Sequence, residues 1–379
     1  MRLTVAQLLP ELEVGGVEQG TLEIAEALVA AGHRAIVISA GGRLVAKLEA
    51  LGATHIALPI GRKRLSSLRL IGRLRETFRR ERVDVVHARS RLPAWLGWWA
   101  RQGLAVAERP RWVTTVHGPY TVNRYSRIMV SGEQVIAISQ FIHDYITGSY
   151  PGVDATRITL IPRGVAPERW PYGFVPDAAW QADWTRAHPA LAGKALLVLP
   201  GRLTRWKGQE DFLQLLARLK AQGLLVHGLL AGGAHPRKQA FEQELHALAA
   251  RLGVADAVTF LGQRNDLREV MAMSACAFSL TGEPEAFGRT TIEALSLGTP
   301  VIGYDHGGTG EILREVLPAG LVPVGDLDAV AARIAQFLQS PPSVPVTHPF
   351  TTERLQSATL GVYADLCTRL GRPRWLLND

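Results

Sequence analysis

Short, almost uninterrupted apolar runs alternate along the chain with amphipathic segments of helical period. In the first half, apolar runs predict strands at 3–9, 35–39, 83–88, 112–116 and 135–138, and amphipathic segments predict helices at 19–31 and 65–82. Strands that are apolar on both faces are typical of a parallel sheet with helices on both sides. This half of the chain therefore predicts a doubly wound α/β domain.

The same alternation begins again in the second half. It predicts strands at 196–200, 224–231, 258–261, 277–280 and 301–304, and helices at 210–221 and 238–252. Between the two patterns, residues 166–194 are rich in Pro, Trp and Ala and have no clear period. A chain of 379 residues is also too long for one ordinary core. We therefore expect two Rossmann-like, doubly wound α/β domains, at 1–170 and 171–351, with a linker at 171–194 and a last helix at 352–370 in the segment 352–379.

Ligands of doubly wound sheets bind beyond the carboxyl ends of the strands. Two such domains joined in one chain predict an active site in a cleft onto which both sets of carboxyl ends face. The composition, with 47% hydrophobic and 20% charged residues, is typical of a soluble globular protein. No apolar run reaches the roughly 18 residues of a membrane-spanning helix.

The N-terminus and the cysteines favour the cytoplasm. Within residues 1–16, acidic residues follow directly after the apolar stretch and there is no small-residue cleavage site, which predicts a strand and a loop and not a signal peptide. Cys276 and Cys367 each lie in apolar surroundings, so we expect buried thiols and neither a disulfide nor a metal framework.

The excess positive charge lies in the first half of the chain. Up to Arg169 there are 23 Lys and Arg against 14 Asp and Glu, and the remainder is close to neutral. The densest stretch contains the following residues: Arg62, Lys63, Arg64, Arg69, Arg73, Arg75, Arg79, Arg80, Arg82, Arg89, Arg91, Arg101, Arg109 and Arg111, together with Trp95, Trp98 and Trp99. Cations mixed with aromatic residues suit an anionic membrane surface or a phosphorylated acceptor. The alternative is a solvated helix face with the tryptophans in the core, and no nucleic-acid motif accompanies the charge.

A glycine-rich loop with two cations follows the strand at 196–200. Arg202 and Lys207 lie between Gly201 and Gly208, directly before the helix at 210–221. Cations and backbone N–H groups at such a turn suit a diphosphate. When a diphosphate is a leaving group, fixed positive charge stabilises the negative charge that develops on it. The alternative is a pair of ordinary loop cations.

Two carboxylates flank a second tight turn. Glu285 precedes Phe287 and Gly288, a helix begins at Arg289, and Glu293 lies two turns into that helix. The first N–H groups of the helix, at Arg289, Thr290 and Thr291, can receive phosphate or sugar oxygens. Carboxylates accept hydrogen bonds from pairs of hydroxyl groups, so Glu285 and Glu293 suit a sugar ring and a ribose.

Together these elements resemble the retaining group 1 glycosyltransferases of family four, which have the GT-B fold. The marks of the resemblance are Glu285-x7-Glu293 with Phe287-Gly288, the loop from Gly201-Arg202 to Lys207-Gly208, and the opening loop Gly15-Gly16-Val17-Glu18. The segments Asp84–Ala88 and Val116–Gly118 and the run Asp305–Glu311 also match landmarks of the family. Residues 161–165 carry Arg163 where the family more often has Asn.

The resemblance implies roles for individual residues. Arg202 and Lys207 would bind the diphosphate, Glu285 the hydroxyls of the donor sugar, and Glu293 the ribose. Gly15 and Gly16 would approach a phosphate closely, and His117 would stand near the transferred sugar as a catalytic residue. Phe287, Gly288, Arg289 and Thr290 would complete the donor site. The last helix would cross back onto the first domain, which would bind the acceptor.

The resemblance implies a retaining hexosyltransferase that needs no metal or other cofactor. A hexose or N-acetylhexosamine would pass from a nucleoside diphosphate sugar, with UDP the commonest nucleotide in the family, to a hydroxyl group. Glucose, galactose and N-acetylglucosamine stay open as donor sugars. The charged first half and the likeness to bacterial envelope enzymes imply a lipid-linked, anionic or lipopolysaccharide-core acceptor, with the protein in the cytoplasm and peripheral on the inner membrane.

Two other classes of function stay in view. A GT-B nucleotide-sugar epimerase or hydrolase would turn over donor without a glycan acceptor. A dinucleotide-dependent oxidoreductase should carry Gly-x-Gly-x-x-Gly after its first strand, and the spacing from Gly15 to Gly20 is different. Asp326 and Asp328 have the spacing of a metal-binding pair, but Asp326 directly precedes a helix and is better interpreted as its N-cap.

Overall fold

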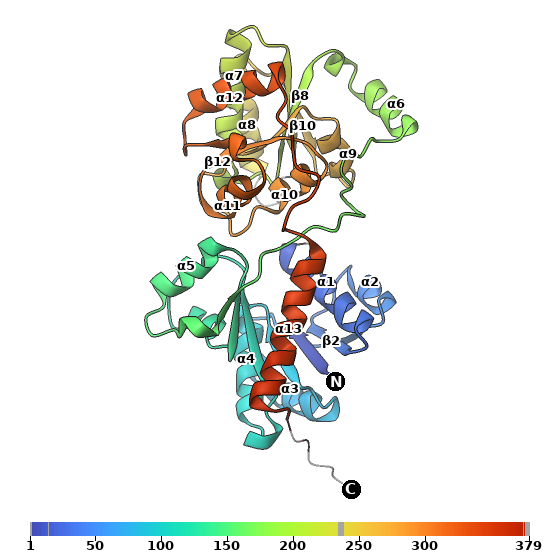
Figure 1. Ribbon diagram of the computed structural model, residues 1–379, viewed down its shortest axis with the longest axis vertical. Coiled ribbons are helices and arrows are strands. Elements are labelled where there is room, and N and C mark those ends of the chain that lie inside the picture. The colour runs from blue at the N-terminus through green and yellow to red at the C-terminus, as the bar shows by residue number, and fades with distance from the viewer. Residues whose placement is uncertain (1, 14, 234–238, 374, 376–379) are drawn as a thin grey trace. The chain divides into compact units, whose positions relative to one another are not determined.

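The computed structural model describes residues 2–13, 15–233, 239–373 and 375 of the chain (Figure 1). It divides into two compact units, one of Met1–Arg163 with Thr352–Asp379 and one of Gly164–Thr351. The first unit ends before the position of 170 that we expected from the sequence. The reason is that Val165 already pairs with the end of the second unit, where it bridges Thr351 and donates a 3.1 Å hydrogen bond to the carbonyl of Phe350.

The first unit is built on a parallel sheet of seven strands. Their order is β3 (Thr54–Ala57), β2 (Arg34–Ser39), β1 (Thr4–Leu8), β4 (Val85–Ala88), β5 (Arg111–Val116), β6 (Gln134–Ala137) and β7 (Ile158–Leu160). In the centre of the sheet, Val5 of β1 lies opposite Ala35 on one side and Val85 on the other. The predicted doubly wound parallel sheet is confirmed, with the order of strands reversing between β1 and β4.

In the described part of the first unit, six helices flank this sheet. They are α1 (Gly16–Ala30), α2 (Val45–Ala50), α3 (Arg69–Arg80), α4 (Arg91–Gln102), α5 (Gln140–Ser149) and α13 (Thr352–Leu370). The helix predicted at 65–82 is shorter than expected, because Leu65–Leu68 form a 3-10 turn before α3 begins. The sequence pattern did not predict α2, α4, α5, β3 or β7.

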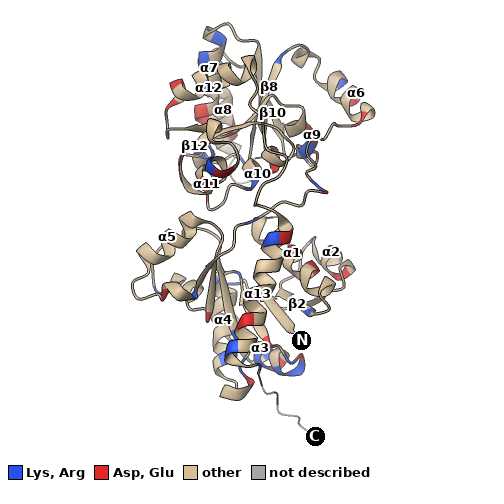
Figure 2. Cartoon of the chain, viewed as in Figure 1, with Lys and Arg blue, Asp and Glu red and all other residues tan. Residues whose placement is uncertain are grey.

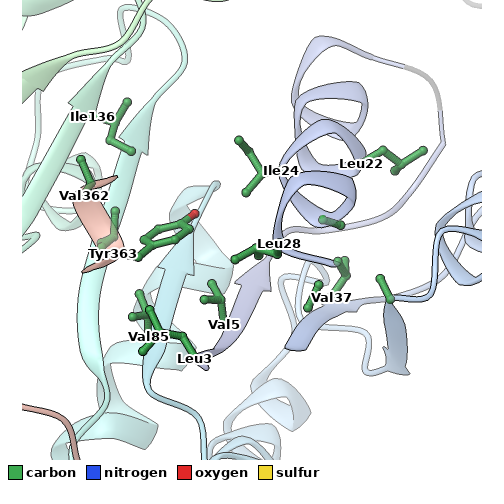
Figure 3. Packing of buried hydrophobic residues seen from close by; sticks show 14 of the residues in the cluster. Leu3, Val5, Leu22, Ile24, Leu28, Val37, Val85, Ile136, Val362 and Tyr363 are labelled. Carbon is green, nitrogen blue, oxygen red and sulfur yellow. The ribbon is translucent and has the colours of Figure 1, made fainter. Parts of the chain in front are cut away.

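Helix α13 contributes to the core of the first unit. Its buried side chains Leu355, Tyr363 and Leu366 belong to the same cluster as Ile24 and Leu28 of α1 (Figure 3). Burial of a large aliphatic or aromatic side chain contributes about 1.5–3 kcal/mol. Helix α13 is therefore part of the hydrophobic core of the first unit.

The second unit repeats the architecture with a parallel sheet of six strands. The order is β10 (Val258–Gly262), β9 (Val226–Ala231), β8 (Ala195–Pro200), β11 (Cys276–Ser279), β12 (Val301–Tyr304) and β13 (Leu321–Val322). Its helices are α6 (Ala178–Ala187), α7 (Gln209–Ala221), α8 (Gln239–Arg251), α9 (Leu267–Ala272), α10 (Arg289–Ser296), α11 (Gly307–Val316) and α12 (Leu327–Gln339).

The segment expected to be a linker, 171–194, contains helix α6. The Trp180 and Trp184 rings stack at 5.1 Å, and the Trp180 indole N–H donates a 2.8 Å hydrogen bond to Asp266. The hydrogen bond to Asp266 attaches α6 to the rest of the second unit. Cys276 and Cys367 are free, buried thiols, as predicted. No helix among the described residues is both long and apolar enough to cross a membrane.

Candidate functional site

The loop between β8 and α7 carries two of the predicted site residues. After Gly201 and Arg202 the chain forms a 3-10 turn, Arg205–Lys207, and reaches α7 through Gly208. Gly208 has a left-handed backbone with φ of 78°, and a Cβ there would overlap the carbonyl oxygen of Leu280. Only glycine fits this position without strain, which explains why the turn needs it.

Lys207 forms an ion pair with Glu285. The Nζ atom of Lys207 donates to Oε1 of Glu285, and the two side chains are 18% and 10% exposed. The same ammonium group lies 4.3 Å from the centre of the Trp206 ring. The structure thus brings together two residues that the sequence analysis assigned to one donor site.

The turn before α10 is built by close backbone packing. Gly288 caps the helix with a left-handed backbone, φ 89°. The N–H of Gly308, at the start of α11, donates a 2.8 Å hydrogen bond to the carbonyl of Glu285, and a Cβ at Gly308 would overlap the backbone of Phe287. The glycines at 307 and 308 therefore let the α11 loop lie directly against the segment that holds Glu285.

Arg289 and Glu293 form a pair on α10. The guanidinium Nε of Arg289 lies 3.5 Å from Oε1 of Glu293, and both side chains are largely buried. Thr290 is half-buried in the first turn of the same helix, and Phe287 is buried directly before it. Together with Lys207 and Glu285, these predicted donor residues cluster beyond the carboxyl ends of β8 and β11.

Arg202 differs from Lys207 in its surroundings. Its side chain is exposed and forms no ion pair with any residue in the described part of the chain, whereas its backbone carbonyl accepts a 3.1 Å hydrogen bond from the buried Gln209. The loop is thus held through its backbone, and the guanidinium group faces solvent.

Gly15 and Gly16 begin helix α1 in the first unit. Gly15 is the N-cap, and its carbonyl accepts a 3.0 Å hydrogen bond from the N–H of Gln19. A Cβ at Gly16 would meet nothing within 4 Å, whereas one at Gly15 would overlap the Glu18 carboxylate. The opening of α1 is therefore uncrowded at Gly16, and its predicted contact with phosphate stays a prediction.

His117 follows β5 and is held by Arg163. An amino group of Arg163 donates a 2.6 Å hydrogen bond to Nδ1 of His117, and the His117 N–H donates to the Tyr120 hydroxyl at 3.3 Å. Nε2 of His117 is buried and has no hydrogen-bond partner among the described residues. Burial, assisted by the nearby Arg163 and Arg89, lowers the pKa of His117 well below its ordinary value, so the imidazole is neutral.

Arg89 is a buried member of this cluster that the sequence analysis did not identify. It was counted with the exposed cations, yet it is 2% exposed and donates a 2.5 Å hydrogen bond to Oε1 of Gln7. A Cβ at Gly20 would overlap the Arg163 guanidinium and crowd that of Arg89. The one sign of this packing in the sequence is Gly20 near the start of the predicted helix at 19–31, which is too weak a signal to predict two buried arginines.

His87, a landmark of the resemblance, is held inside the first unit. Its Nδ1 pairs with the Tyr363 hydroxyl of α13 and its Nε2 with the Thr115 hydroxyl, both at 2.6 Å. Both ring nitrogens thus have partners within the fold, which gives His87 a structural role in attaching α13.

The basic stretch includes an open groove of about 530 Å³. Its apolar lining includes Leu68, Leu92, Leu96 and Trp99, and its charged lining is Arg62, Lys63 and Arg64. Leu68 and Trp99 are 54% and 42% exposed. The groove thus combines exposed apolar side chains with three cations.

Other cations of the stretch have structural partners. Arg79 on α3 pairs with Glu108 at 3.0 Å, and Arg101 on α4 pairs with Glu133 at 3.1 Å. Figure 2 shows the charged residues on α3. Trp98 packs edge-on against the buried Trp112, while Trp99 is exposed. The stretch thus has a packed face at α3 and α4 and an exposed groove beside them, and its binding to a membrane or a phosphorylated acceptor stays a prediction.

Asp326 is the N-cap of α12, as predicted. Its side chain accepts a 2.8 Å hydrogen bond from the N–H of Ala329, and Asp328 pairs with Arg218 at 2.9 Å. Within the described ranges, no three His, Cys, Asp or Glu side chains gather to form a metal site. That the reaction needs no metal stays a prediction of the sequence analysis.

Comparisons with known proteins agree with this arrangement. Residues 14–169 match the model of Glycosyltransferase Family 4, and residues 181–347 match that of Glycosyl transferases group 1. The chain is similar to N-acetyl-alpha-D-glucosaminyl L-malate synthase of Bacillus anthracis, with 26% identity over 286 residues that cover 72% of this chain and 70% of the relative. It is also similar to phosphatidyl-myo-inositol mannosyltransferase of Mycobacterium leprae, with 27% identity over 336 residues, 86% of this chain and 84% of the relative.

Solved structures share the fold over nearly the whole chain. A glycosyltransferase from Rickettsia africae superposes with a TM-score of 0.84 at 25% identity and covers 97% of this chain and 99% of its own. The Anabaena protein HepE, solved in complex with UDP and glucose, superposes with a TM-score of 0.80 at 22% identity and covers 96% of this chain and all of its own. The chain belongs to the group 1 glycosyltransferases of family four, and its two parallel-sheet units have the GT-B fold.

Proposed function

We propose that this glycosyltransferase moves a hexose or N-acetylhexosamine from a UDP-sugar to a membrane-associated, anionic glycan, such as a lipopolysaccharide core, with retention and without a metal. The observation that carries the proposal is the pairing of Lys207 with Glu285 beside the N-terminus of α10. One fixed cation and one carboxylate at the same place suit the two halves of a nucleotide sugar, its diphosphate and its sugar hydroxyls.

The second unit supplies the donor chemistry in this proposal. Lys207 and Arg202 stabilise the charge that develops on the leaving diphosphate, and Glu285 accepts hydrogen bonds from the sugar hydroxyls. Arg289 and Thr290, in the first turn of α10, offer backbone N–H groups to phosphate oxygens, and Glu293 binds the ribose. UDP as the nucleotide is supported by the shared fold with HepE, whose structure holds UDP and glucose.

Retention follows a route on a single face of the sugar. A double displacement needs a carboxylate that attacks the anomeric carbon, and the proposal gives Glu285 a binding role because its carboxylate is paired with Lys207. An oxygen of the leaving diphosphate then accepts the proton of the acceptor hydroxyl while the new glycosidic bond forms on the same face. In this proposal the positive charges of Lys207 and Arg202 stabilise the negative charge on the diphosphate, as a metal ion does in other transferases.

The acceptor is proposed to be anionic and bound to the first unit. The two relatives are named for L-malate and for phosphatidyl-myo-inositol, which are both anions. The groove of Arg62, Lys63 and Arg64 beside Leu68 and Trp99 suits an amphiphile with a charged headgroup. This chemistry supports a place for the protein on the cytoplasmic face of the inner membrane.

The donor proposal is tested by thermal unfolding with UDP, GDP and ADP and their sugars, without added metal. A ligand that binds only the folded protein adds about 2.7 kcal/mol at 100 times its dissociation constant. We expect a shift with UDP and UDP-sugars that is lost in Lys207→Ala and kept in Arg205→Ala, because Arg205 pairs with Glu244 on the surface. A shift with GDP or ADP alone would overturn the choice of UDP. Breakdown of donor at full rate without any acceptor would instead favour a hydrolase or epimerase.

A further inference from the structure

The hydrogen bond between Arg163 and His117 fixes where the imidazole carries its proton. A guanidinium group can only donate hydrogen bonds, and Nδ1 of His117 lies 2.6 Å from an Arg163 amino group. Nδ1 is therefore the acceptor, and the proton of the neutral ring is on Nε2.

The charged groups around His117 keep the ring neutral. Burial, Arg163 after β7, Arg89 after β4 and His87 on β4 all disfavour a second proton. On α1, Glu23 lies near Arg89 and offsets part of its charge. From α13, the Tyr363 hydroxyl pairs with Nδ1 of His87.

Arg163 has little freedom to release His117. Its side chain is 6% exposed, and it lies against Gly20 of α1, where a Cβ would overlap the guanidinium group. The tautomer is thus set by the packing of α1 against the loop after β7.

Nε2–H of His117 is a buried donor without an acceptor among the described residues. A buried donor that is left unsatisfied destabilises a fold, so such groups are rare unless they have a functional use. The ring can give this proton to a ligand oxygen, but it cannot accept a proton at Nδ1, where Arg163 already donates.

We propose that Arg163 is a positioning residue, which holds His117 as the Nε2–H tautomer so that the imidazole is a fixed hydrogen-bond donor to a hydroxyl oxygen of the transferred sugar. The identity of that ligand rests on the proposed function. His117 then orients the sugar and is not the base that removes the acceptor proton, because its only free nitrogen carries a proton.

Nitrogen-15 NMR of the full-length protein, labelled at histidine, tests the tautomer without any assay of activity. In the wild type we expect Nδ1 without a proton, Nε2 with one, and no titration of His117 between pH 5 and 8. Arg163→Gln should release the ring, because an amide can also accept a hydrogen bond, and His117 should then titrate or show both tautomers. Arg163→Lys keeps a group that only donates and should retain the Nε2–H form. A proton on Nδ1 in the wild type, or titration of His117 near pH 6.5, would overturn the proposal.

Substitution of His117 tests the use of the donor. The amide N–H of Gln reaches the position of Nε2, whereas Ala removes the donor. We expect His117→Gln to keep a kcat within about tenfold of the wild type and His117→Ala to lose roughly tenfold more, as for one lost hydrogen bond to a ligand, with matched melting temperatures. The kcat of the wild type should not fall at acid pH through protonation of His117, whereas the kcat of Arg163→Gln should fall there. This difference would support the Nε2–H tautomer of His117 in the wild type. Equal kcat in the His117→Gln and His117→Ala variants would overturn the hydrogen bond from His117 to the sugar. The tautomer of His117 would then still be decided by the NMR experiment. If no donor sugar is turned over by the wild type, the proposed function fails, and the tautomer is judged by NMR alone.

Discussion

Lys207 and Glu285, which lie 78 residues apart in the sequence, pair with each other where the loops after β8 and β11 meet. These strands are neighbours in the sheet, with Leu197 opposite Cys276, so their carboxyl ends deliver both side chains to one place. The pair balances two charges that are each largely removed from solvent. It also presets the cation and the carboxylate that the proposed reaction needs.

Removal of the Lys207 ammonium should reduce activity strongly. Lys207→Ala takes away one group that stabilises the leaving diphosphate, which costs about 10²–10³ in kcat. It also leaves the 10% exposed Glu285 carboxylate without its partner, so the free energy of unfolding should fall by about 1–3 kcal/mol. Steady-state kinetics and urea unfolding measure the two effects.

A double variant separates stability from catalysis. Lys207→Met with Glu285→Gln removes both charges, which should restore much of the stability because no unpaired ion stays buried, whereas activity should not return. Arg205→Ala is the matched control, since this cation of the same turn is 66% exposed and pairs on the surface. Recovery of activity in the double variant would contradict a role for Lys207 toward the diphosphate.

Gly208 should be sensitive to substitution for two separate reasons. A left-handed backbone costs a non-glycine residue about 1–2 kcal/mol, and a Cβ at 208 would also overlap the carbonyl of Leu280. Gly208→Ala should therefore lower the free energy of unfolding by more than that backbone cost and displace the Lys207 turn.

Gly223 provides the control for the backbone contribution. Its φ is 75°, close to the 78° of Gly208, but a Cβ at Gly223 would meet nothing within 4 Å. Gly223→Ala should lose only about 1–2 kcal/mol and keep the binding of UDP. Similar losses in the two variants, measured by urea unfolding, would show that the contact with Leu280 does not matter.

Central strands and long helices could be predicted from the sequence, and edge elements could not. The apolar run 301–304 became β12 and the segment 352–370 became α13 with unchanged bounds, because both are buried along one continuous face. The edge strands β3 and β7 have no fully buried residue, so they leave no apolar run. In α4, Arg91 and Arg101 lie in the same segment as three tryptophans, and this mixture of charged and aromatic residues conceals the helical period.

The chemistry of the second-unit site was more predictable than that of the first unit. Glycines at the turns marked Lys207 and Glu285, because a tight turn restricts the residue types that can form it. By contrast, Arg89 lies in a stretch dominated by exposed cations, and its burial depends on Gln7 of β1 and Gly20 of α1. Contacts between distant segments decide such positions, and one sequence does not contain them as a local pattern.

The groove beside α4 should bind anionic membranes through its three cations. Each Lys or Arg near a charged bilayer contributes about 1 kcal/mol, so reversal of Arg62, Lys63 and Arg64 to Glu should weaken binding by roughly 100-fold or more. Co-sedimentation with phosphatidylglycerol vesicles measures this, with phosphatidylcholine vesicles as the uncharged comparison. Trp99→Ala should weaken binding to a smaller extent, because it removes apolar contact only.

A set of paired cations in the second unit serves as the control for net charge. Each already has an acidic partner within 3 Å: Arg186 with Asp183, Arg218 with Asp328, and Lys220 with Asp256. Their reversal to Glu changes the net charge by the same amount and should leave vesicle binding nearly unchanged. If both triple variants lose binding equally, the attraction belongs to the whole protein and the groove has no special role.

Acid should destabilise the second unit through His227 on β9. The side chain is buried, and its Nε2 lies 2.9 Å from the Thr259 hydroxyl. Burial, with a contribution from Lys194, lowers the pKa of His227 from its ordinary value of 6.5 to about 4. Between these two values the unfolded chain binds a proton that the folded chain does not, so stability falls as the pH drops from about 6.5 toward 4, at up to about 1.4 kcal/mol per pH unit.

His227→Gln removes this proton uptake and keeps a polar partner for Thr259. The variant should therefore lose stability less steeply than the wild type below pH 6.5, while the two curves run parallel above pH 7, where neither form of His227 takes up a proton. Urea unfolding followed from pH 8 to pH 5 measures both slopes. The buried His87 and His117 also have lowered pKa values, so the variant should keep a residual slope from the first unit. Identical slopes in the two proteins would mean that His227 is protonated as easily in the folded chain as in the unfolded one.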